Sequence, residues 1–345
     1  MSVEKILNNY SRVITKGYVK TGGLKYKNYV VSNLRGGVGK STLSFNLSFE
    51  MSRNDSLLVA DLCPQCNLTE VYLRGSGAKL TVYDALRPRL LGPAFGDQVK
   101  EVSVRVSKYC DSFLNHECFF IPGDPEMFAF PSPMYQQLQL ASASPSRSEG
   151  VVRKLLLSLK DILDNEMKIK DCNKSLLDTS PFYSGGTHLS WCAADALIVP
   201  VRVDEHSIES LGLTFRMLTD ASNDFVSWNE RAGGLTIPKI AAVVMTMVGS
   251  KSQKKATPDA ASCMYINRAL EIAEKYSNLF DYEDPSDAFV LLDDFLSSGR
   301  ISGAKSIPIS ELNSGQFHTV QGSRLQVNSS VERYKNQLRY LVSIL

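Results

Sequence analysis

The chain has 345 residues, and its 38 lysines and arginines nearly balance 36 aspartates and glutamates, for a net charge of +2. This balance excludes a histone-like polycation and an acidic disordered tail. At this length the chain forms one large domain or two small ones, and it is long enough to bury a sizeable core. Its seven scattered cysteines do not indicate a disulfide scaffold, and its first residues lack a signal-peptide core. We therefore expect a reduced cytoplasmic protein.

Residues 1–27 precede the first apolar run that is typical of a strand. Within them, Ile6, Leu7, Tyr10, Val13 and Ile14 fit one face of an amphipathic helix. A basic linker follows, with lysines at positions 16, 20, 25 and 27. The segment is too short for an independent helix-turn-helix domain. We expect an N-terminal extension over residues 1–27 and a single domain over residues 28–345.

Short apolar runs alternate along the rest of the chain with longer helical patterns. The expected strands cover residues 29–31, 57–60, 119–121, 175–177, 196–199 and 240–244. The expected helices cover residues 41–51, 126–141, 151–167, 207–221, 260–276 and 330–345. The strand runs lack polar alternation, which is typical of strands with helices on both faces. The pattern predicts an α/β fold with a mostly parallel central sheet.

The strongest motif lies between the first strand and the helix that follows it. It reads Arg35-Gly-Gly-Val-Gly-Lys-Ser-Thr42. Backbone N–H groups of such a loop can surround a phosphate, and the helix N-terminus adds a positive partial charge. In this pattern Lys40 reaches the β- and γ-phosphates, and Ser41 offers its hydroxyl to Mg²⁺. Leu34 stands where the strict G-x-x-x-x-G-K-[ST] pattern has its first glycine.

Six blocks in collinear order resemble the deviant Walker-A ATPases of the ParA/MinD type. The loop is similar to the family's K-G-G-x-G-K-[ST], and residues 58–69 resemble its V-D-x-D-P-Q-x-N-x-T block. Residues 176–181 resemble the Walker-B D-x-x-P. The segments 80–86, 120–124 and 194–201 resemble T-x-Y-D-x-L, I-P-A and A-D-x-V-I-x-P-V. The matches span about residues 28–250, and the last hundred residues match only loosely.

The resemblance implies a P-loop NTPase fold, the cofactors ATP and Mg²⁺, and a homodimer that sandwiches two nucleotides. It implies nucleotide contacts from the whole loop: Arg35, Gly36, Gly37, Val38, Gly39, Lys40, Ser41 and Thr42. Ser41 and Asp178 are the implied metal-site residues. Lys40, Arg35 and Asp61 are the implied catalytic residues.

Position 35 departs from the family pattern, because the family has a lysine there that reaches the partner's phosphates. Arginine keeps the charge and can grip a phosphate with two hydrogen bonds, but its geometry differs from that of an ammonium group. Arg35 can therefore act on the other subunit's nucleotide. The alternatives are an intramolecular or a solvated arginine.

Cys63 is the larger departure, since the family's second block has an aspartate there that positions the attacking water. A neutral thiol does not polarise water as a carboxylate does, so we expect competent binding with slow hydrolysis. Cys63 and Cys66 also form a C-x-x-C pair, which elsewhere indicates redox chemistry or zinc. No second close Cys or His pair completes a zinc site, so we interpret the pair as a substitution within the block.

The leading hypothesis is a ParA-like ATP-binding protein that serves plasmid or chromosome partition or a related positioning system. Its ATP-bound homodimer would bind non-specific DNA and a ParB-like or other partner protein, in association with the nucleoid. The alternative is a non-hydrolysing adaptor that binds nucleotide and recruits a partner through residues 1–27. A metabolic enzyme of the dethiobiotin synthetase type is disfavoured by the D-x-x-P-Q-x-N pattern.

Two further surfaces are open to interpretation. The candidate DNA contacts are basic side chains near the sixth expected strand and on the next helix, namely Lys251, Lys254, Lys255 and Arg268. An ordinary solvated loop and helix face explains them equally well. The apolar spacing of the last helix fits a helix packed on the sheet better than a membrane anchor. We do not expect membrane docking.

Overall fold

The structure is a computed structural model that describes residues 3–143, 148–252 and 257–345. Within these residues, eight strands form one sheet in the order β10-β7-β6-β1-β5-β2-β4-β3. Neighbouring strands are parallel except for the edge pair of β4 and β3. The strands are β1 (Asn28–Val31), β2 (Leu57–Asp61), β3 (Val104–Arg105), β4 (Cys118–Ile121), β5 (Lys174–Asp178), β6 (Ala196–Arg202), β7 (Lys239–Val248) and β10 (Phe289–Asp293). The predicted α/β fold with a mostly parallel sheet is confirmed.

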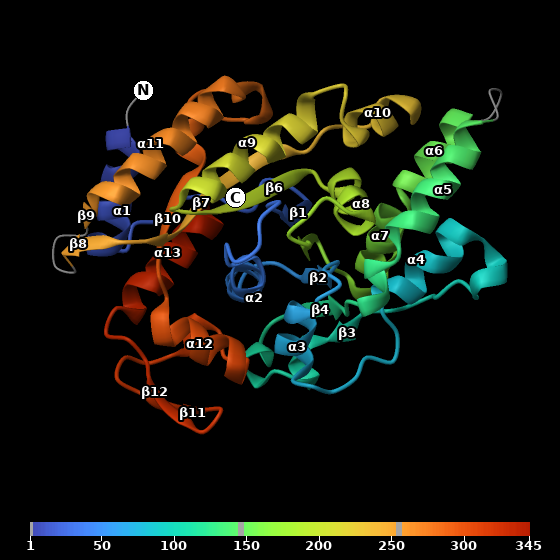
Figure 1. Cartoon of the computed structure of the whole chain (residues 1–345). Coiled ribbons are helices and arrows are strands. Elements are labelled where there is room, and N and C mark those ends of the chain that lie inside the picture. The colour runs from blue at the N-terminus through green and yellow to red at the C-terminus, as the bar shows by residue number, and fades with distance from the viewer. Residues whose placement is uncertain (1–2, 144–147, 253–256) are drawn as a thin grey trace.

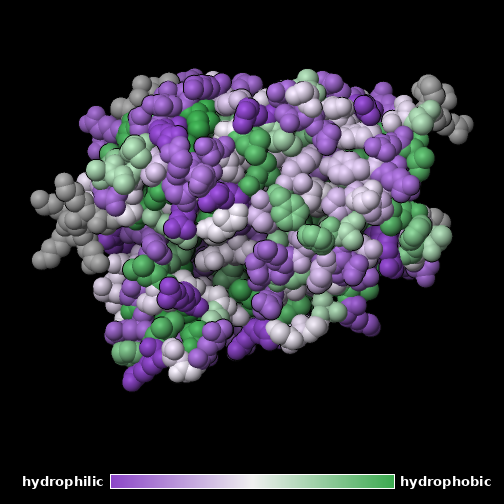
Figure 2. Space-filling view, in the orientation of Figure 1, coloured by the Kyte–Doolittle hydropathy of each residue, from purple (hydrophilic) through white to green (hydrophobic). Residues whose placement is uncertain are grey.

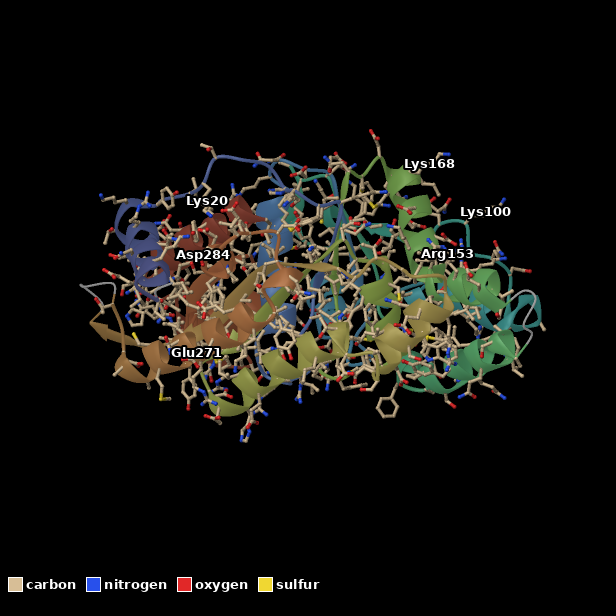
Figure 3. All side chains as sticks on the ribbon, turned by 90° about the horizontal axis from the view of Figure 1, so that it is seen from above. Lys20, Lys100, Arg153, Lys168, Glu271 and Asp284 are labelled. Atoms are coloured by element: carbon tan, nitrogen blue, oxygen red, sulfur yellow. The ribbon has the colours of Figure 1, made fainter. Side chains whose placement is uncertain are left out.

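Helices cover both faces of the sheet (Figure 1). One face carries α4 (Val82–Leu91), α5 (Pro131–Ser142), α6 (Ser148–Leu156), α7 (Ser158–Lys170), α8 (Gly185–Ala193), α9 (Glu205–Thr219), α10 (Asp224–Arg231) and α11 (Ala260–Lys275). The other face carries α2 (Lys40–Met51), α3 (Asn67–Leu73), α12 (Leu296–Lys305) and α13 (Val331–Ile344). Seen from above, α9 and α11 lie next to each other over the sheet (Figure 3). Each face of the sheet therefore packs into its own hydrophobic core.

Strand β1 shows why the sequence produces these two layers. All of its residues are buried, and their side chains alternate between the faces. Val30 packs into the core on the α9 side, whereas Tyr29 and Val31 pack into the core on the α2 side. An unbroken apolar run therefore satisfies both layers. Because β1 lies between parallel neighbours, the loop after Val31 emerges at the carboxyl edge of the sheet.

Several elements differ from the predicted ones. The helix expected over residues 151–167 is divided into α6 and α7, because the backbone at Leu157 (φ −89°, ψ 2°) is not helical. The helix expected from residue 126 begins at Pro131, since proline is favoured in the first helical turn. The sequence pattern does not predict β3, β10, α3, α4, α8, α10, α12 or the hairpins β8–β9 (Ser250–Ser252, Thr257–Pro258) and β11–β12 (Phe317–Val320, Ser323–Gln326).

The N-terminal residues form the expected amphipathic helix, α1 (Val3–Lys16), which packs against the rest of the fold. Its buried residues are Ile6, Tyr10 and Val13, and it contacts α13, α11 and the edge strand β10. The linker after it also reaches the body, because the backbone N–H of Lys25 donates to the carbonyl of Leu345 at 2.8 Å. The apolar face of α1 thus covers the β10 edge of the sheet.

Helix α13 packs Tyr334, Leu338 and Leu341 into the core on the α2 side of the sheet. Its apolar face is thereby buried within the protein. Across the described ranges, no helix has the length and the apolar composition needed to cross a membrane.

A buried histidine lies within an aromatic cluster between α8 and its neighbours. His188 is fully buried, and its Nδ1 lies 3.0 Å from the Tyr135 hydroxyl. The rings of Tyr183 and Phe225 also lie against it. Burial lowers the pKa of His188 to about 3, so the imidazole is neutral in the folded protein.

This burial predicts acid destabilisation that begins below pH 6.5, the ordinary pKa of histidine. Between about pH 3 and 6.5 the unfolded chain binds the His188 proton and the folded chain does not. The unfolding free energy is therefore unaffected by His188 protonation above pH 6.5, and it decreases as the pH falls from 6.5 to about 3. We expect the unfolding free energy of the wild type to fall between pH 7.5 and pH 5. In His188→Phe this fall should be smaller by about 2 kcal/mol, measured by urea denaturation. His206→Gln, at an exposed site, is the control. Equal slopes for His188→Phe and the wild type would contradict the prediction.

Candidate functional site

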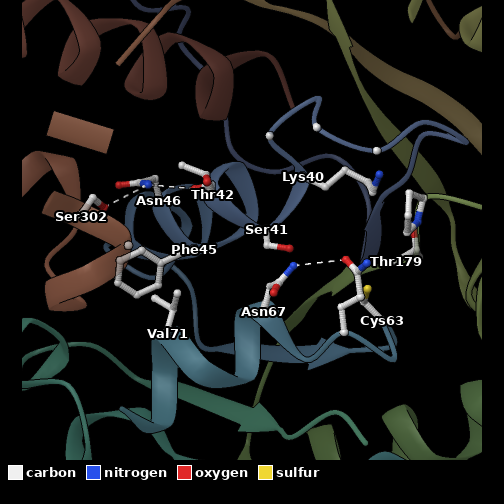
Figure 4. A pocket seen from close by; sticks show the side chains of 16 residues that line it. Lys40, Ser41, Thr42, Phe45, Asn46, Cys63, Asn67, Val71, Thr179 and Ser302 are labelled. Atoms are coloured by element: carbon white, nitrogen blue, oxygen red, sulfur yellow. Dashed lines mark hydrogen bonds between the residues drawn. The ribbon is translucent and has the colours of Figure 1, made fainter. Parts of the chain in front are cut away.

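The glycine-rich loop connects β1 to α2 at the carboxyl edge of the sheet. Gly37 and Gly39 have φ angles of 75° and 87°, which a residue with a side chain rarely adopts. The loop borders a cavity of about 290 Å³, and the surface is hollowed over α2 where this cavity opens (Figure 2). The lining residues come from the loop, the start of α2, the segment after β2, the segment after β5, and α12. They include Lys40, Ser41, Thr42, Asn46, Cys63, Asn67, Thr179 and Ser302 (Figure 4).

Lys40 is the first residue of α2 and is almost completely buried. Its ammonium group donates to the carbonyls of Asn33, at 3.0 Å, and Arg35, at 2.7 Å. Burial lowers the pKa of Lys40 to about 8, although the charge of Asp178 opposes the shift. The loop therefore holds a cation at the edge of the cavity through its own backbone.

Asp178 ends β5 and is fully buried beside the start of α2. Ser41 donates to one carboxylate oxygen at 2.6 Å, and Ser44 donates to the other at 2.8 Å. Burial and the nearby charge of Asp61 raise the pKa of Asp178 to about 7. A hydroxyl and a carboxylate in contact are oxygen ligands of the kind that Mg²⁺ binds. These residues thus fit the implied metal.

Asp61 ends β2 and is the register partner of Asp178 on the adjacent strand. Its carboxylate accepts the backbone N–H of Cys63 at 3.0 Å, and the N–H and hydroxyl of Thr69 at 2.9 Å and 2.7 Å. A Cβ added to Gly123 would lie 3.0 Å from the Asp61 carboxyl carbon, so this position requires glycine. Burial raises the pKa of Asp61 to about 6. Asp61 therefore orders the segment after β2 through hydrogen bonds.

Cys63 lines the cavity and is 3% exposed. Burial raises the pKa of its thiol to about 11, so the group is neutral near pH 7. Cys66 is in the left-handed conformation before α3, and burial likewise raises the pKa of its thiol, to about 12. Among the described residues, no group of three or more His, Cys, Asp or Glu side chains is placed to hold a metal. Neither thiol has the lowered pKa of a reactive cysteine.

Arg35 does not line the cavity that the three glycines of its loop line. Its side chain is 40% exposed and lies near Asp204, with 4.0 Å between Nε and the carboxylate. It borders a separate surface depression with residues of α9, including Leu213 and Arg216. Val38 likewise faces away from the first cavity.

Sequence reasoning missed a second cavity, of about 430 Å³, that adjoins the loop on the side of β7 and β10. It shares Gly39 and Thr42 with the first cavity. Its other lining residues are mostly apolar and come from distant segments: Val38, Leu43, Thr246, Met247, Leu292, Asp293, Asp294, Phe295, Leu296, Gly299 and Arg300. The apolar run at 289–292 was a signal for a strand that could have pointed to this region.

The expected DNA contacts are only partly visible. Lys254 and Lys255 lie outside the described residues, and Lys251 is described only through the backbone of β8. Arg268 lies on α11 and forms a two-pronged ion pair with Glu205 at the start of α9. Its guanidinium is thus already engaged within the chain.

A comparison with family models matches residues 26–227 to the AAA domain. The chain belongs to the AAA domain family. Its fold is the P-loop NTPase fold that the resemblance implied. A search of curated proteins finds no match to this AAA domain protein.

Solved structures share the fold of this AAA domain protein at low sequence identity. McdA from Cyanothece, solved as a variant in complex with ATP, is 20% identical, with a TM-score of 0.57. The match covers 84% of this chain and 92% of McdA. A proposed plasmid partition protein from Borrelia burgdorferi B31, bound to AMPPNP, is 14% identical, with a TM-score of 0.52. That match covers 92% of this chain and 99% of the other.

The burial of Asp178 predicts that its charged carboxylate lowers the folding stability of this AAA domain protein. Asp178→Asn keeps oxygen and nitrogen atoms that can pair with Ser41 and Ser44 but carries no charge. We expect it to raise the unfolding free energy by about 2 kcal/mol at pH 8, measured by urea denaturation. The raised pKa makes this gain largest above about pH 7 and negligible below about pH 4.

We expect MgCl₂ with ATP to raise the unfolding free energy of the wild type and to raise that of Asp178→Asn less, because a neutral amide is a weaker Mg²⁺ ligand. Asp161→Asn, at an exposed site on α7, is the matched control and should change neither quantity. A lower stability of Asp178→Asn at pH 8 would show that the carboxylate stabilises the fold and would contradict the prediction.

Proposed function

We propose that the chain is a ParA-like ATPase that binds ATP with Mg²⁺ and dimerises around two nucleotides. The nucleotide state would control its binding to DNA and to a ParB-like or other partner protein, in partition or a related positioning system. One observation carries the proposal: a glycine loop with left-handed backbone, a buried Lys40, and Ser41 in contact with Asp178 all border one cavity. The ATP and AMPPNP bound by the two solved relatives support the choice of ligand.

In this proposal the two cavities hold different parts of the nucleotide. The first cavity has the glycine N–H groups and Lys40, which suit phosphates. Ser41 and Asp178 would hold Mg²⁺, whose chemistry when bound is to neutralise phosphate charge. The second cavity is larger and mostly apolar, which suits a flat heteroaromatic base. Thr42 borders both cavities, and it would lie near the α-phosphate.

The placement of Arg35 supports a role toward a second subunit. Its guanidinium lies on the α9 side, outside the phosphate cavity of its own chain. Exposed apolar residues lie on the segments around it, with Phe182 and Leu213 each 40% exposed. A second copy that covers this face would bury apolar area and bring Arg35 toward the partner's nucleotide. DNA contact would then come from a basic patch that the dimer assembles, because one chain has a net charge of only +2.

Slow hydrolysis follows from Cys63, a neutral thiol at the cavity where the related block has a carboxylate. Phosphoryl transfer to water depends on a group that orients the water, so its replacement reduces turnover more than binding. The same observation favours a second candidate function, a nucleotide-binding adaptor that does not hydrolyse ATP. Appreciable ATP turnover by the wild type, stimulated by DNA or a partner, would exclude the adaptor.

The proposal predicts that Lys40→Ala abolishes nucleotide-dependent dimerisation. Loss of a buried cation at the phosphates should reduce ATP affinity by about 100-fold or more, measured by isothermal titration calorimetry with Mg²⁺. Analytical ultracentrifugation should show an ATP-dependent dimer for the wild type only. Lys168→Ala, at an exposed site on α7, is the matched control and should behave as the wild type. If the wild type neither binds ATP nor changes its oligomeric state, the proposal is wrong.

A second prediction concerns Cys63→Asp, which restores a carboxylate to the cavity. We expect ATP turnover with Mg²⁺ to increase by about tenfold or more, measured as phosphate release, while ATP affinity changes little. Cys63→Ser, which is neutral and of similar size, separates the effect of charge from that of volume. No increase for Cys63→Asp would mean that another group already orients the water.

A further inference from the structure

The second cavity is bordered by strained backbone. Met247 and Leu296 have φ angles of 57° and 49°, in the left-handed region that bulky residues rarely adopt. Both line this cavity: Met247 lies near the end of β7, and Leu296 is the first residue of α12. Such strain persists only where the surrounding structure fixes it, and it is concentrated at binding sites. The segment 293–296, between β10 and α12, must therefore be held firmly in place.

Asp293 fixes the start of this segment through its contacts with α13. It is the last residue of β10, and it is 8% exposed. One carboxylate oxygen accepts the side-chain amide of Gln337 at 3.0 Å, and the other pairs with Arg333 at 2.6 Å. The backbone N–H of Asp293 donates to the side-chain carbonyl of Gln337 at 3.1 Å. Asp293 thus fixes the start of the segment to α13.

The remaining partner of this carboxylate comes from the N-terminal helix. The hydroxyl of Tyr10 donates to Asp293 Oδ1 at 2.5 Å, across 283 positions of sequence. Tyr10 is 3% exposed, so this hydrogen bond is sheltered from water. Helix α1 is also tied to the segment before β10, where Lys5 pairs with Asp284 at 2.9 Å and Asp287 at 2.8 Å. Figure 3 shows α1 and Asp284 at the same end of the molecule.

We propose that α1 completes the base-binding end of the nucleotide site, and that Tyr10 is a positioning residue that holds the cavity-lining segment 293–296 through Asp293. This inference rests on the proposed function, because the second cavity must receive the base. Tyr10 itself does not line the cavity. It acts through a buried hydrogen bond to the residue that anchors Asp294, Phe295 and Leu296, which do line it.

The arrangement couples the attachment of α1 to occupancy of the cavity. A base that binds only when the segment 293–296 is ordered shifts the protein toward the state in which Tyr10 is bonded to Asp293. By linkage, the packing of α1 against the body increases the affinity for the base. In the proposed function the phosphates would lie at the first cavity, whose lining includes no residue of the segment 293–296. A ligand with phosphates but no base should therefore be insensitive to α1.

The test compares ATP with inorganic tripolyphosphate, each with Mg²⁺, by isothermal titration calorimetry on the full chain. Tyr10→Phe removes one buried hydroxyl and keeps the ring. We expect it to weaken ATP binding by about five- to tenfold and to leave tripolyphosphate binding within about twofold. Tyr18→Phe makes the same chemical change where the ring lies against Tyr340 and Arg12, outside the cavity, and should leave both affinities unchanged.

Hydrogen exchange of the wild type gives a second measurement that does not depend on the variant folding. ATP should slow amide exchange in α1, and tripolyphosphate should not. The inference is overturned if Tyr10→Phe binds ATP as the wild type does, if it weakens both ligands equally, or if ATP leaves exchange in α1 unchanged. A wild type that binds neither ligand would instead overturn the proposed function, and this inference with it.

Discussion

The contact between Ser41 and Asp178 is the constraint on which the site depends. It joins the first turn of α2 to the end of β5, so the glycine loop cannot move independently of the sheet. Ser44 adds a second hydrogen bond one turn further along the same helix. Because β1 and β5 are adjacent and parallel, the loop and the carboxylate emerge at the same edge. The glycine loop, Ser41, Asp178 and Lys40 are therefore placed together by the order of the strands.

The sequence predicted the parts of this site that are local. The loop 35–42 and the carboxylate at 178 are recognisable because their chemistry requires particular residues at fixed spacing beside a strand. The two-layer α/β fold followed from uninterrupted apolar strands, and the structure confirms it. The roles given to the residues of the site are proposals. Arg35 lies outside the cavity that Lys40 and Ser41 line and borders a separate depression beside α9.

Most of the second cavity could not be predicted, because its walls come from segments far apart in the chain. Met247 and Leu296 have no sequence signal for a left-handed backbone, which glycine would have given. Tyr10 looked like one apolar position of an amphipathic helix, yet its hydroxyl is bonded to Asp293. Local patterns specify which face of a helix is buried. They do not specify which distant polar group the buried face will meet.

The pairing of Asp61 with Asp178 at the ends of neighbouring strands has a consequence for the life of the protein in a cell. Burial raises the pKa of both carboxylates, so keeping them charged at neutral pH costs folding free energy. Ligands that neutralise this charge would increase the folding stability by mass action. The fraction of molecules that unfold and become open to proteases would then fall when such ligands bind.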